Sequence, residues 1–220
     1  MCVVGIIGNG PGSSIPHLKA YEDEVDIWIG ADRGALTLVN QGIKVDYALG
    51  DFDSVSVDEK ATIIKQASHS DVHPSMKDET DLEIALSKAY DLNAKKIYLF
   101  GITGGRLDHA LVNVQLLHQM IHQGVHGVIV DVWNKIEMKE PGTHTILKDD
   151  DYTYVSFVPF TEVVKSISLI DFAYPLENYD LHWGSTRLIS NELLLNSGTL
   201  IFEEGLLLFI QSRDEGEVTK

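Results

Sequence analysis

The stretch KIYLFGITGGRLDHALVNVQLLHQM, residues 96–120, places a strand, a turn and a helix in direct succession. Lys96–Phe100 is a short and mostly apolar run, which is typical of a buried strand. Gly101–Arg106 is rich in glycine and predicts a turn. In Asp108–Gln123 the apolar side chains recur at the spacing of a helix. Such a strand–turn–helix unit is the building block of a parallel sheet covered by helices.

The same unit repeats toward the N-terminus. The apolar runs predict strands at Val3–Ile7, Val25–Gly30, Tyr47–Leu49 and Gly127–Val132. Between them the spacing of apolar residues predicts helices at Ala35–Gln41, Asp58–Gln66 and Asp81–Leu92. We therefore predict an α/β domain with a mostly parallel sheet for residues 1–135.

The pattern changes after about Trp133, where the helical spacing ends. Short runs of strand type follow, separated by turn residues, and we expect strands at Thr143–Leu147, Tyr152–Val158, Ser166–Phe172, Tyr179–Trp183, Gly198–Phe202 and Leu206–Ser212. Short strands at this spacing predict an antiparallel sandwich or barrel for residues 136–220. The boundary is expected between Asn134 and Gly142.

The composition excludes several classes of protein. The chain has 220 residues with 17 basic and 33 acidic side chains, and its formal net charge is −16. A nucleic-acid footprint needs a basic face, so we expect no nucleic-acid partner. No apolar run is long enough to cross a bilayer, and the single cysteine, Cys2, permits no intramolecular disulfide. We expect a cytoplasmic protein without a membrane partner, in which any phosphate ligand needs metal ions or local cations.

Asp51 and Asp53 follow the strand predicted at Tyr47–Leu49. In an open α/β sheet, ligands bind beyond the carboxyl ends of the strands. Side chains two residues apart in an extended segment point the same way, so the two carboxylates repel each other unless a cation lies close to both. Mg²⁺ prefers such carboxylates together with water and phosphate oxygens. The alternative is a surface turn, in which Gly-Asp and Asp-Ser pairs are common.

The segment KDETD, residues 77–81, precedes the helix predicted at Asp81–Leu92. The backbone N–H groups at a helix N-terminus favour anions. Capping of the helix by Asp78 or Thr80 explains one or two of these polar residues, but not all of them together with Lys77. We therefore place Lys77, Asp78, Thr80 and Asp81 among the candidate site residues.

The glycine-rich turn at Gly104-Gly105 leads into Arg106-Leu107-Asp108. Arginine offers a planar fork to phosphate oxygens, and Asp108 is placed to orient it or to join a metal shell. Capping of the next helix by Asp108 is the alternative. The turns after two other strands carry further polar residues, and the candidates near a nucleotide are Asn9, Gly10, Asp32, Arg33 and His109. Metal carboxylates, an arginine and glycine turns at strand ends together indicate phosphoryl chemistry.

These motifs resemble those of the thiamine pyrophosphokinase family. They are GADRGA (30–35), LGDFDSV (49–55), KDETDLEIAL (77–86), GGRLDHALVNVQLL (104–117) and SNELL (190–194), in the same order as in the family. The resemblance spans nearly the whole chain. It implies an α/β domain followed by a β-sandwich, and a homodimer whose active sites lie in clefts between the subunits.

The resemblance also implies a role for individual residues. Asp51, Asp53 and Asp81 would hold Mg²⁺, with Asp78 and Asp108 supporting that shell. Lys77, Thr80 and Arg106 would address the phosphates of ATP, and Ser190 and Asn191 would face thiamine. Trp183 is the candidate aromatic partner of the thiamine rings. GADRGA carries Arg33 where many members have glycine, which places an extra cation near the nucleotide.

The implied reaction moves a diphosphate group from ATP to the hydroxyl of thiamine and releases AMP. An aspartate near that hydroxyl, Asp81 or Asp78, is placed to take its proton, although positioning and charge neutralisation are expected to contribute more. Two alternatives remain. One is a related diphosphotransferase that acts on a hydroxymethylpterin. The other is a nucleotide-binding protein without turnover, which the intact set of acidic residues argues against.

Overall fold

The computed structural model describes residues 1–72, 79–214 and 216. The chain divides into two compact units, Met1–Val132 and Trp133–Lys220, which we call unit 1 and unit 2. The sequence placed the division after residue 135. The roles expected for the two parts, catalysis with ATP and magnesium in the first and thiamine binding with dimerisation in the second, stay predictions.

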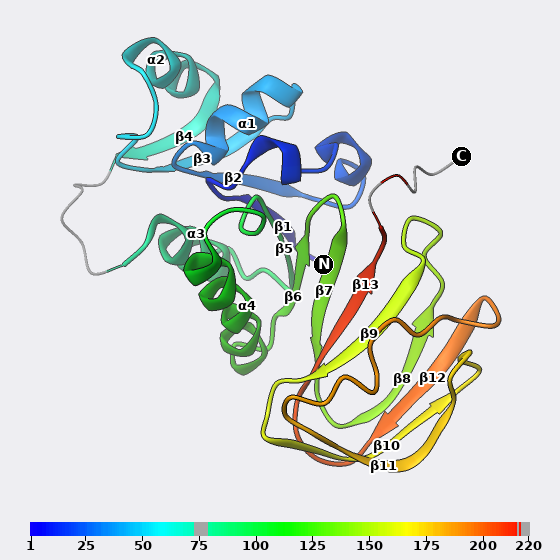
Figure 1. Ribbon diagram of the computed structural model, residues 1–220. Coiled ribbons are helices and arrows are strands. Elements are labelled where there is room, and N and C mark those ends of the chain that lie inside the picture. The colour runs from blue at the N-terminus through cyan, green and yellow to red at the C-terminus, as the bar shows by residue number, and fades with distance from the viewer. Residues whose placement is uncertain (73–78, 215, 217–220) are drawn as a thin grey trace. The chain divides into compact units, whose positions relative to one another are not determined.

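Unit 1 is built on a parallel sheet (Figure 1). Its strands lie in the order β4-β3-β2-β1-β5-β6. Their bounds are β1 Val3–Ile7, β2 Ile27–Ala31, β3 Val45–Gly50, β4 Ala67–Val72, β5 Lys96–Phe100 and β6 His126–Val130. The strand order reverses at β1, because β2 and β5 both pair with β1 from opposite sides and the chain builds the sheet outward in both directions from it. Ligands of open α/β sheets bind beyond the carboxyl ends of the strands at such a point.

Helices cover both faces of this sheet. Figure 1 shows α1 (Gly34–Gln41) and α2 (Val57–Gln66) on one face, and α3 (Asp81–Asp91) and α4 (Leu107–His122) on the other. Short 3₁₀ turns at Gly12–Ser14 and Leu18–Tyr21 follow β1. Strands β1, β2, β5 and β6 are apolar almost throughout because both of their faces are buried. One core cluster of unit 1 joins Ile7, Trp28 and Phe100 from the strands with Leu38 from α1.

Capping boxes fix the starts of two helices. The Ser56 hydroxyl accepts a hydrogen bond from the Glu59 backbone N–H, and the Glu59 carboxylate accepts one from the Ser56 backbone N–H. Thr80 and Glu83 form the same reciprocal pair at α3. Each box satisfies donors that a helix N-terminus would otherwise leave without a partner. The start of each helix, and with it the end of the preceding loop, is therefore set by the sequence.

Unit 2 consists of antiparallel strands. Strand β13 (Leu207–Ser212) pairs with β7 (Asn134–Lys139) and with β9 (Tyr154–Pro159). The other sheet has the order β11-β10-β12-β8, with bounds β8 Gly142–Leu147, β10 Val163–Ile170, β11 Leu176–His182 and β12 Ser197–Phe202. The core cluster between the sheets includes Phe157 and Phe209 on one side and Leu169 and Phe202 on the other. Both sheets therefore bury one face against a shared apolar core.

The predicted fold class is confirmed: a mostly parallel α/β unit precedes an antiparallel β-rich unit. Two strands were not predicted. β4 has the sequence ASHSDV, which offers no apolar pattern, and β7 was taken as part of the domain boundary. No helix in the described ranges, 1–72 and 79–214, combines the length and the apolar character that crossing a membrane requires.

Candidate active site

Three carboxylates come together beyond the carboxyl ends of β2 and β3. Each of Asp32, Asp51 and Asp53 offers an oxygen, and these oxygens all lie within 4.8 Å of one another. Asp32 is buried, Asp51 is half-buried and Asp53 is exposed, so the group reaches from the interior of unit 1 to its surface. The sequence predicted the pair Asp51 and Asp53 as metal ligands, but it placed Asp32 with the nucleotide.

An unusual backbone directs these side chains. Asp32 has φ +50° and Phe52 has φ +58°, in the left-handed region that residues other than glycine seldom adopt. The Phe52 side chain is only 3% exposed, so it anchors the middle of the segment in the core while its two aspartate neighbours point elsewhere. Backbone conformations of this kind cost free energy, and they persist where the surrounding structure holds them.

The charges of this cluster act on one another. The charge of Asp51, followed by desolvation and by the charge of Asp32, raises the pKa of Asp53 above its ordinary value. Among the described residues, Oδ1 of Asp32 is buried without a hydrogen-bond partner. Its Oδ2 accepts hydrogen bonds from the Ser54 hydroxyl at 2.5 Å and from the Asn9 amide at 3.4 Å. Three converging carboxylates and an oxygen left without a donor are the donor set that suits Mg²⁺.

The residues at the start of α3 are described only in part. Lys77 and Asp78 lie outside the described residues. The Thr80 hydroxyl caps α3, donating to the Glu83 carboxylate at 2.9 Å and accepting from the Glu83 backbone N–H at 3.3 Å. Asp81 is the first residue of α3 and does not belong to the carboxylate group found among the described residues. Its place in a metal shell stays a prediction.

Arg106 and Asp108 form an exposed two-point ion pair at the start of α4. Arg106 Nε donates to Asp108 Oδ1 at 3.1 Å, and Nη2 donates to Oδ2 at 2.5 Å. The hydrogen bond from Arg106 is the main reason why the pKa of Asp108 falls to about 2. The same pair raises the pKa of Arg106. Asp108 therefore orients the guanidinium. Its alternative role in a metal shell and a phosphate contact of Arg106 stay predictions.

The glycine turns after β1 and β5 approach each other closely. The Gly10 backbone N–H donates to the Gly101 carbonyl at 2.6 Å. A Cβ atom at position 10 would lie 2.5 Å from that oxygen, so only glycine fits there. His109 is exposed on α4, and its contact with a nucleotide stays a prediction. The turns that carry Asn9 and Arg106 are thus joined through their backbones.

Two of the residues expected at thiamine differ in exposure. Ser190 is exposed and has φ +55°, and its backbone N–H donates to the Ser156 hydroxyl. Asn191 is only 2% exposed. Its Oδ1 accepts from the Tyr174 and Glu192 backbone N–H groups at 3.0 and 2.9 Å, and its Nδ2 donates to the Tyr174 carbonyl at 2.9 Å. The Asn191 side chain therefore holds the backbone of its neighbourhood together.

Aromatic side chains remain exposed in the same unit. Tyr174, whose backbone Asn191 holds at both polar groups, is 68% exposed. Trp183 is 72% exposed, and its backbone N–H donates to the Glu162 carbonyl at 2.9 Å. Tyr174 was missed in the sequence because no motif contains it. Its connection to the SNELL motif appears only through the hydrogen bonds of Asn191.

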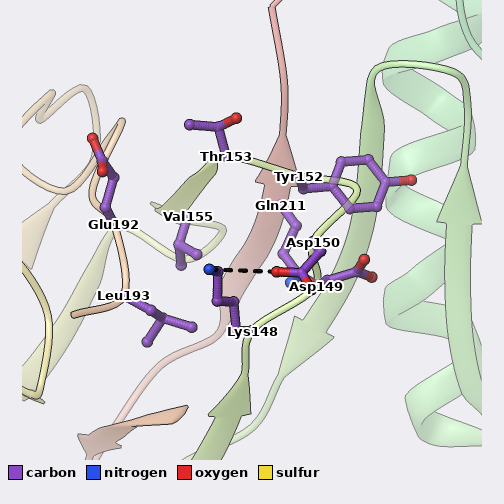
Figure 2. Close-up of a pocket in the computed structure, with 9 residues that line it drawn as sticks. All are labelled: Lys148, Asp149, Asp150, Tyr152, Thr153, Val155, Glu192, Leu193 and Gln211. Carbon is purple, nitrogen blue, oxygen red and sulfur yellow. Dashed lines mark ion pairs between the residues drawn. The ribbon is translucent and has the colours of Figure 1, made fainter. Parts of the chain in front are cut away.

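A pocket of about 250 Å³ lies within unit 2 beside SNELL (Figure 2). Its lining includes Asp149, Asp150 and Glu192, with Lys148 as the basic side chain, paired to Asp150 at 3.3 Å. Tyr152, Thr153, Val155, Leu193 and Gln211 complete the lining. None of the predicted metal or phosphate residues belongs to it. This pocket and the carboxylate cluster are therefore separate features, and we give the pocket no part in phosphoryl transfer.

Comparisons with known proteins agree with this assignment of parts. Residues 18–129 match the model of the thiamin pyrophosphokinase catalytic domain, and residues 143–207 match the vitamin B1 binding domain of the same enzymes. A curated thiamine pyrophosphokinase of Bacillus subtilis is 42% identical over 214 residues, covering 97% of this chain and 100% of the relative.

Solved structures give the same result. A crystal structure of the Bacillus subtilis thiamine pyrophosphokinase matches with a TM-score of 0.91 at 41% identity, over 97% of this chain and 100% of that chain. One from Geobacillus thermodenitrificans matches with a TM-score of 0.88 at 42% identity, over 98% and 100%. The chain belongs to the thiamin pyrophosphokinase family.

Proposed function

We propose that this protein is a thiamine pyrophosphokinase, which transfers a diphosphate group from ATP to the hydroxyl of thiamine and yields thiamine diphosphate and AMP. The observation that carries the proposal is the 42% identity to a thiamine pyrophosphokinase over the full length of that relative. The carboxylate cluster at the strand ends supplies the chemistry that such a transfer needs. The expected substrates are ATP and thiamine, and the expected product keeps both phosphoryl groups together.

The metal site of the proposal consists of Asp32, Asp51 and Asp53, with Asp81 as a further ligand. The three clustered carboxylates support it, as does the buried Oδ1 of Asp32, which no described residue satisfies. A bound Mg²⁺ would neutralise phosphate charge and orient the phosphate chain for in-line attack. The aspartates hold their oxygens convergent before any ligand arrives, which reduces the reorganisation required during the reaction.

Phosphate recognition is assigned to Lys77, Thr80 and Arg106. Arg106 is supported by its ion pair with Asp108, which fixes the plane of the guanidinium through Nε and Nη2 and leaves Nη1 outside that pair. A guanidinium in fixed orientation binds phosphate oxygens more selectively than a mobile cation. Thr80 offers the N-terminus of α3, although its hydroxyl is shared with the capping box. Asp81 or Asp78 is assigned to accept the proton of the thiamine hydroxyl.

Thiamine recognition is assigned to the SNELL region of unit 2. Ser190 contributes an exposed hydroxyl, whereas Asn191 contributes by holding Tyr174. The exposed ring of Tyr174 makes it a candidate aromatic partner for the cationic thiazolium, beside Trp183. A homodimer with sites completed by both subunits, and a cytoplasmic location, belong to the same proposal.

The direct test incubates the protein with Mg²⁺, ATP and thiamine and measures AMP and thiamine diphosphate. We expect both products in equal amounts. Asp51→Asn and Asp53→Asn should each lower kcat/KM at least ~100-fold, as removal of other electrostatic stabilisers does. The matched control is Asp91→Asn, an exposed carboxylate at the end of α3, which should leave the rate unchanged. Release of ADP in place of AMP would contradict diphosphate transfer.

Substrate choice is tested separately. Thermal unfolding in the presence of thiamine or hydroxymethylpterin, each with a non-hydrolysable ATP analogue, should show an increase in Tm with thiamine alone. An increase with the pterin would favour the related diphosphotransferase. Binding of ATP without any product would favour a nucleotide-binding protein that lacks turnover.

A further inference from the structure

The segment Asp51–Ser56 carries two of the three clustered carboxylates, and the side chain of Arg33 reaches it from the end of β2. Arg33 Nη1 donates to the Ser54 carbonyl at 3.0 Å. Its Nη2 lies 3.9 Å from a carboxylate oxygen of Glu59 in α2. About half of the Arg33 side chain is exposed. The guanidinium thus connects the end of β2, the aspartate segment and the first turn of α2.

The three clustered carboxylates repel one another before any metal binds. Oxygens of Asp32, Asp51 and Asp53 converge within 4.8 Å, and like charges at such distances repel. Without a cation among them, this repulsion is reduced most easily if the exposed segment with Asp51 and Asp53 moves away from the buried Asp32. The segment therefore needs attachments that keep it in place without occupying the oxygens themselves.

The attachments found in the structure have this property. Both Arg33 and Lys60 donate to backbone carbonyls of the segment: Arg33 to Ser54 and Lys60 to Asp51, each at 3.0 Å. Neither of these two hydrogen bonds uses an oxygen of the three clustered carboxylates. A cation bound to a carboxylate would compete with a metal ion, whereas a cation bound to the adjacent carbonyl makes the local potential less negative and leaves the carboxylate available.

Ser54 is held from both sides by Asp32 and Arg33, the two residues that directly follow β2. Its hydroxyl donates to Asp32 Oδ2 at 2.5 Å, and its carbonyl accepts from Arg33. This places the Asp32 carboxylate and the aspartate segment in a fixed relation. Glu59 is itself fixed by the capping box with Ser56, so the far side of the guanidinium meets a carboxylate that cannot swing toward the cluster.

From these contacts we propose that Arg33 is a positioning residue that preorganises the metal site, and not a ligand of the ATP phosphates. The inference rests on the proposed function, because it takes the carboxylate cluster as a metal site. Arg33 holds the Asp51–Ser56 segment against the repulsion of the three carboxylates. Ions then find the oxygens already convergent, and less of their binding free energy is used to order the segment.

The test measures Mn²⁺ binding by electron paramagnetic resonance in the absence of nucleotide, so that phosphate contacts play no part. We expect Arg33→Ala to weaken Mn²⁺ binding about tenfold, the lower end of the range for residues that orient metal ligands. Arg33→Gln keeps a donor for the Ser54 carbonyl and should recover part of the loss. Lys44→Ala, which removes an exposed cation paired with Asp46 in the same unit, should bind as the wild type does.

The outcomes separate the inference from the function on which it rests. No Mn²⁺ binding by the wild type would overturn the metal site, and the inference with it. Wild-type binding by Arg33→Ala would overturn the inference alone. Equal weakening by Lys44→Ala would mean that only net charge matters, which also overturns it. If Arg33→Ala fails to show the wild-type circular dichroism spectrum, Mn²⁺ binding by Arg33→Gln is compared with that by Lys44→Ala. Weaker binding by Arg33→Gln would support the inference, and equal binding would overturn it.

Turnover distinguishes positioning from phosphate binding. For Arg33→Ala we expect half-maximal rate at about tenfold higher Mg²⁺, with the rate at saturating Mg²⁺ within about threefold of the wild type. The KM for ATP at saturating Mg²⁺ should stay close to the wild-type value. A KM for ATP that rises tenfold or more while Mn²⁺ binding is unaltered would show a phosphate ligand and would overturn the proposal.

Discussion

Asp32 is the residue whose role changed most between sequence and structure. In the sequence it follows a strand and precedes Arg33, which is compatible with any ligand at that sheet edge. The structure groups it with Asp51 and Asp53 and leaves its Oδ1 buried without a described partner. The distinction was not predictable from spacing, because it depends on the left-handed backbone of Asp32 and on the hydrogen bond from Ser54.

Replacement of Asp32 by asparagine keeps the shape of the side chain and removes its charge. We expect Asp32→Asn to lose most Mn²⁺ binding and to lower kcat/KM at least ~100-fold, while the Tm rises or stays the same because repulsion within the cluster is relieved. Calorimetric titration with Mn²⁺ and a thermal unfolding curve measure both effects. Undiminished metal binding would remove Asp32 from the site.

The lowered pKa of Asp108 leads to a prediction about how the Arg106–Asp108 pair depends on pH. The folded pKa of Asp108 is about 2, below the ordinary value, chiefly because of the hydrogen bond from Arg106. A depressed carboxylate pKa contributes stability above the unfolded pKa and loses it as the pH falls through the folded pKa. The Arg106–Asp108 pair should therefore persist down to about pH 2. A carbonyl NMR titration should show this midpoint in the wild type and a midpoint near the ordinary ~3.9 in Arg106→Ala; equal midpoints would mean that the pair does not form in solution.

Asn191 illustrates what a motif conceals. The pair Ser190-Asn191 suggests two polar groups that face the same ligand, but adjacent residues here have different tasks. Asn191 satisfies the backbone of Tyr174 from the interior, while Ser190 remains at the surface. The motif contains both kinds of residue, so the sequence alone cannot separate the residue that faces a ligand from the residue that holds the backbone in place.

At the scale of elements, strands with a continuous apolar run were predictable from the sequence, whereas the polar strand β4 and the boundary strand β7 were not. Strands β1 and β5 were predicted with their bounds, because each is a buried apolar run. Strand β4 consists largely of small and polar residues and is held by its pairing with β3, from Val45↔Ala67 to Gly50↔Val72. Strand β7 alternates Ile136 and Met138 with charged residues and was hidden by the change of pattern at the boundary. Pairing supplied by distant neighbours carries no local signal.

Thr80, at the start of α3, has two possible roles, capping the helix and binding phosphate, and they can be tested separately. The loss of the Thr80 cap in Thr80→Ala should cost about 1 kcal/mol and lower the Tm by about 2–4 °C. Ser56→Ala removes the equivalent cap of α2 and should have the same effect on Tm. If Thr80 also meets phosphate, Thr80→Ala alone should raise the KM for ATP. Equal KM values in the two variants would limit Thr80 to capping.

At the scale of the whole molecule, the predicted residues are segregated along the chain. The metal and phosphate candidates precede residue 132, and the thiamine candidates follow residue 133. The fold class of both units was predictable because periodicity and turn residues change once, near that point. The assignment of metal and phosphate binding to unit 1 and of thiamine binding to unit 2 came from the family motifs. No physical property of the isolated segments reveals these roles.

Subunit cooperation follows from the proposed homodimer and is open to a mixing experiment. Asp51→Asn impairs the metal site, and the double variant Tyr174→Ala with Ser190→Ala impairs the thiamine region. If each site takes residues from two chains, a mixture of the two inactive variants should regain part of the wild-type rate, because one site in a mixed dimer carries no substitution. Native mass spectrometry of differently tagged chains verifies exchange. Exchange without any regained activity would mean that each chain builds its own site.

The carboxylates of the cluster come from two separate strand ends, with Asp32 after β2 and the pair Asp51 and Asp53 after β3. In an unfolded chain these groups are joined by a long and mobile connection, and no ion is held by all three. The ligand set therefore comes into existence only when β2 and β3 have paired. We therefore expect metal ions to stabilise strands that have already paired, and not to guide their pairing.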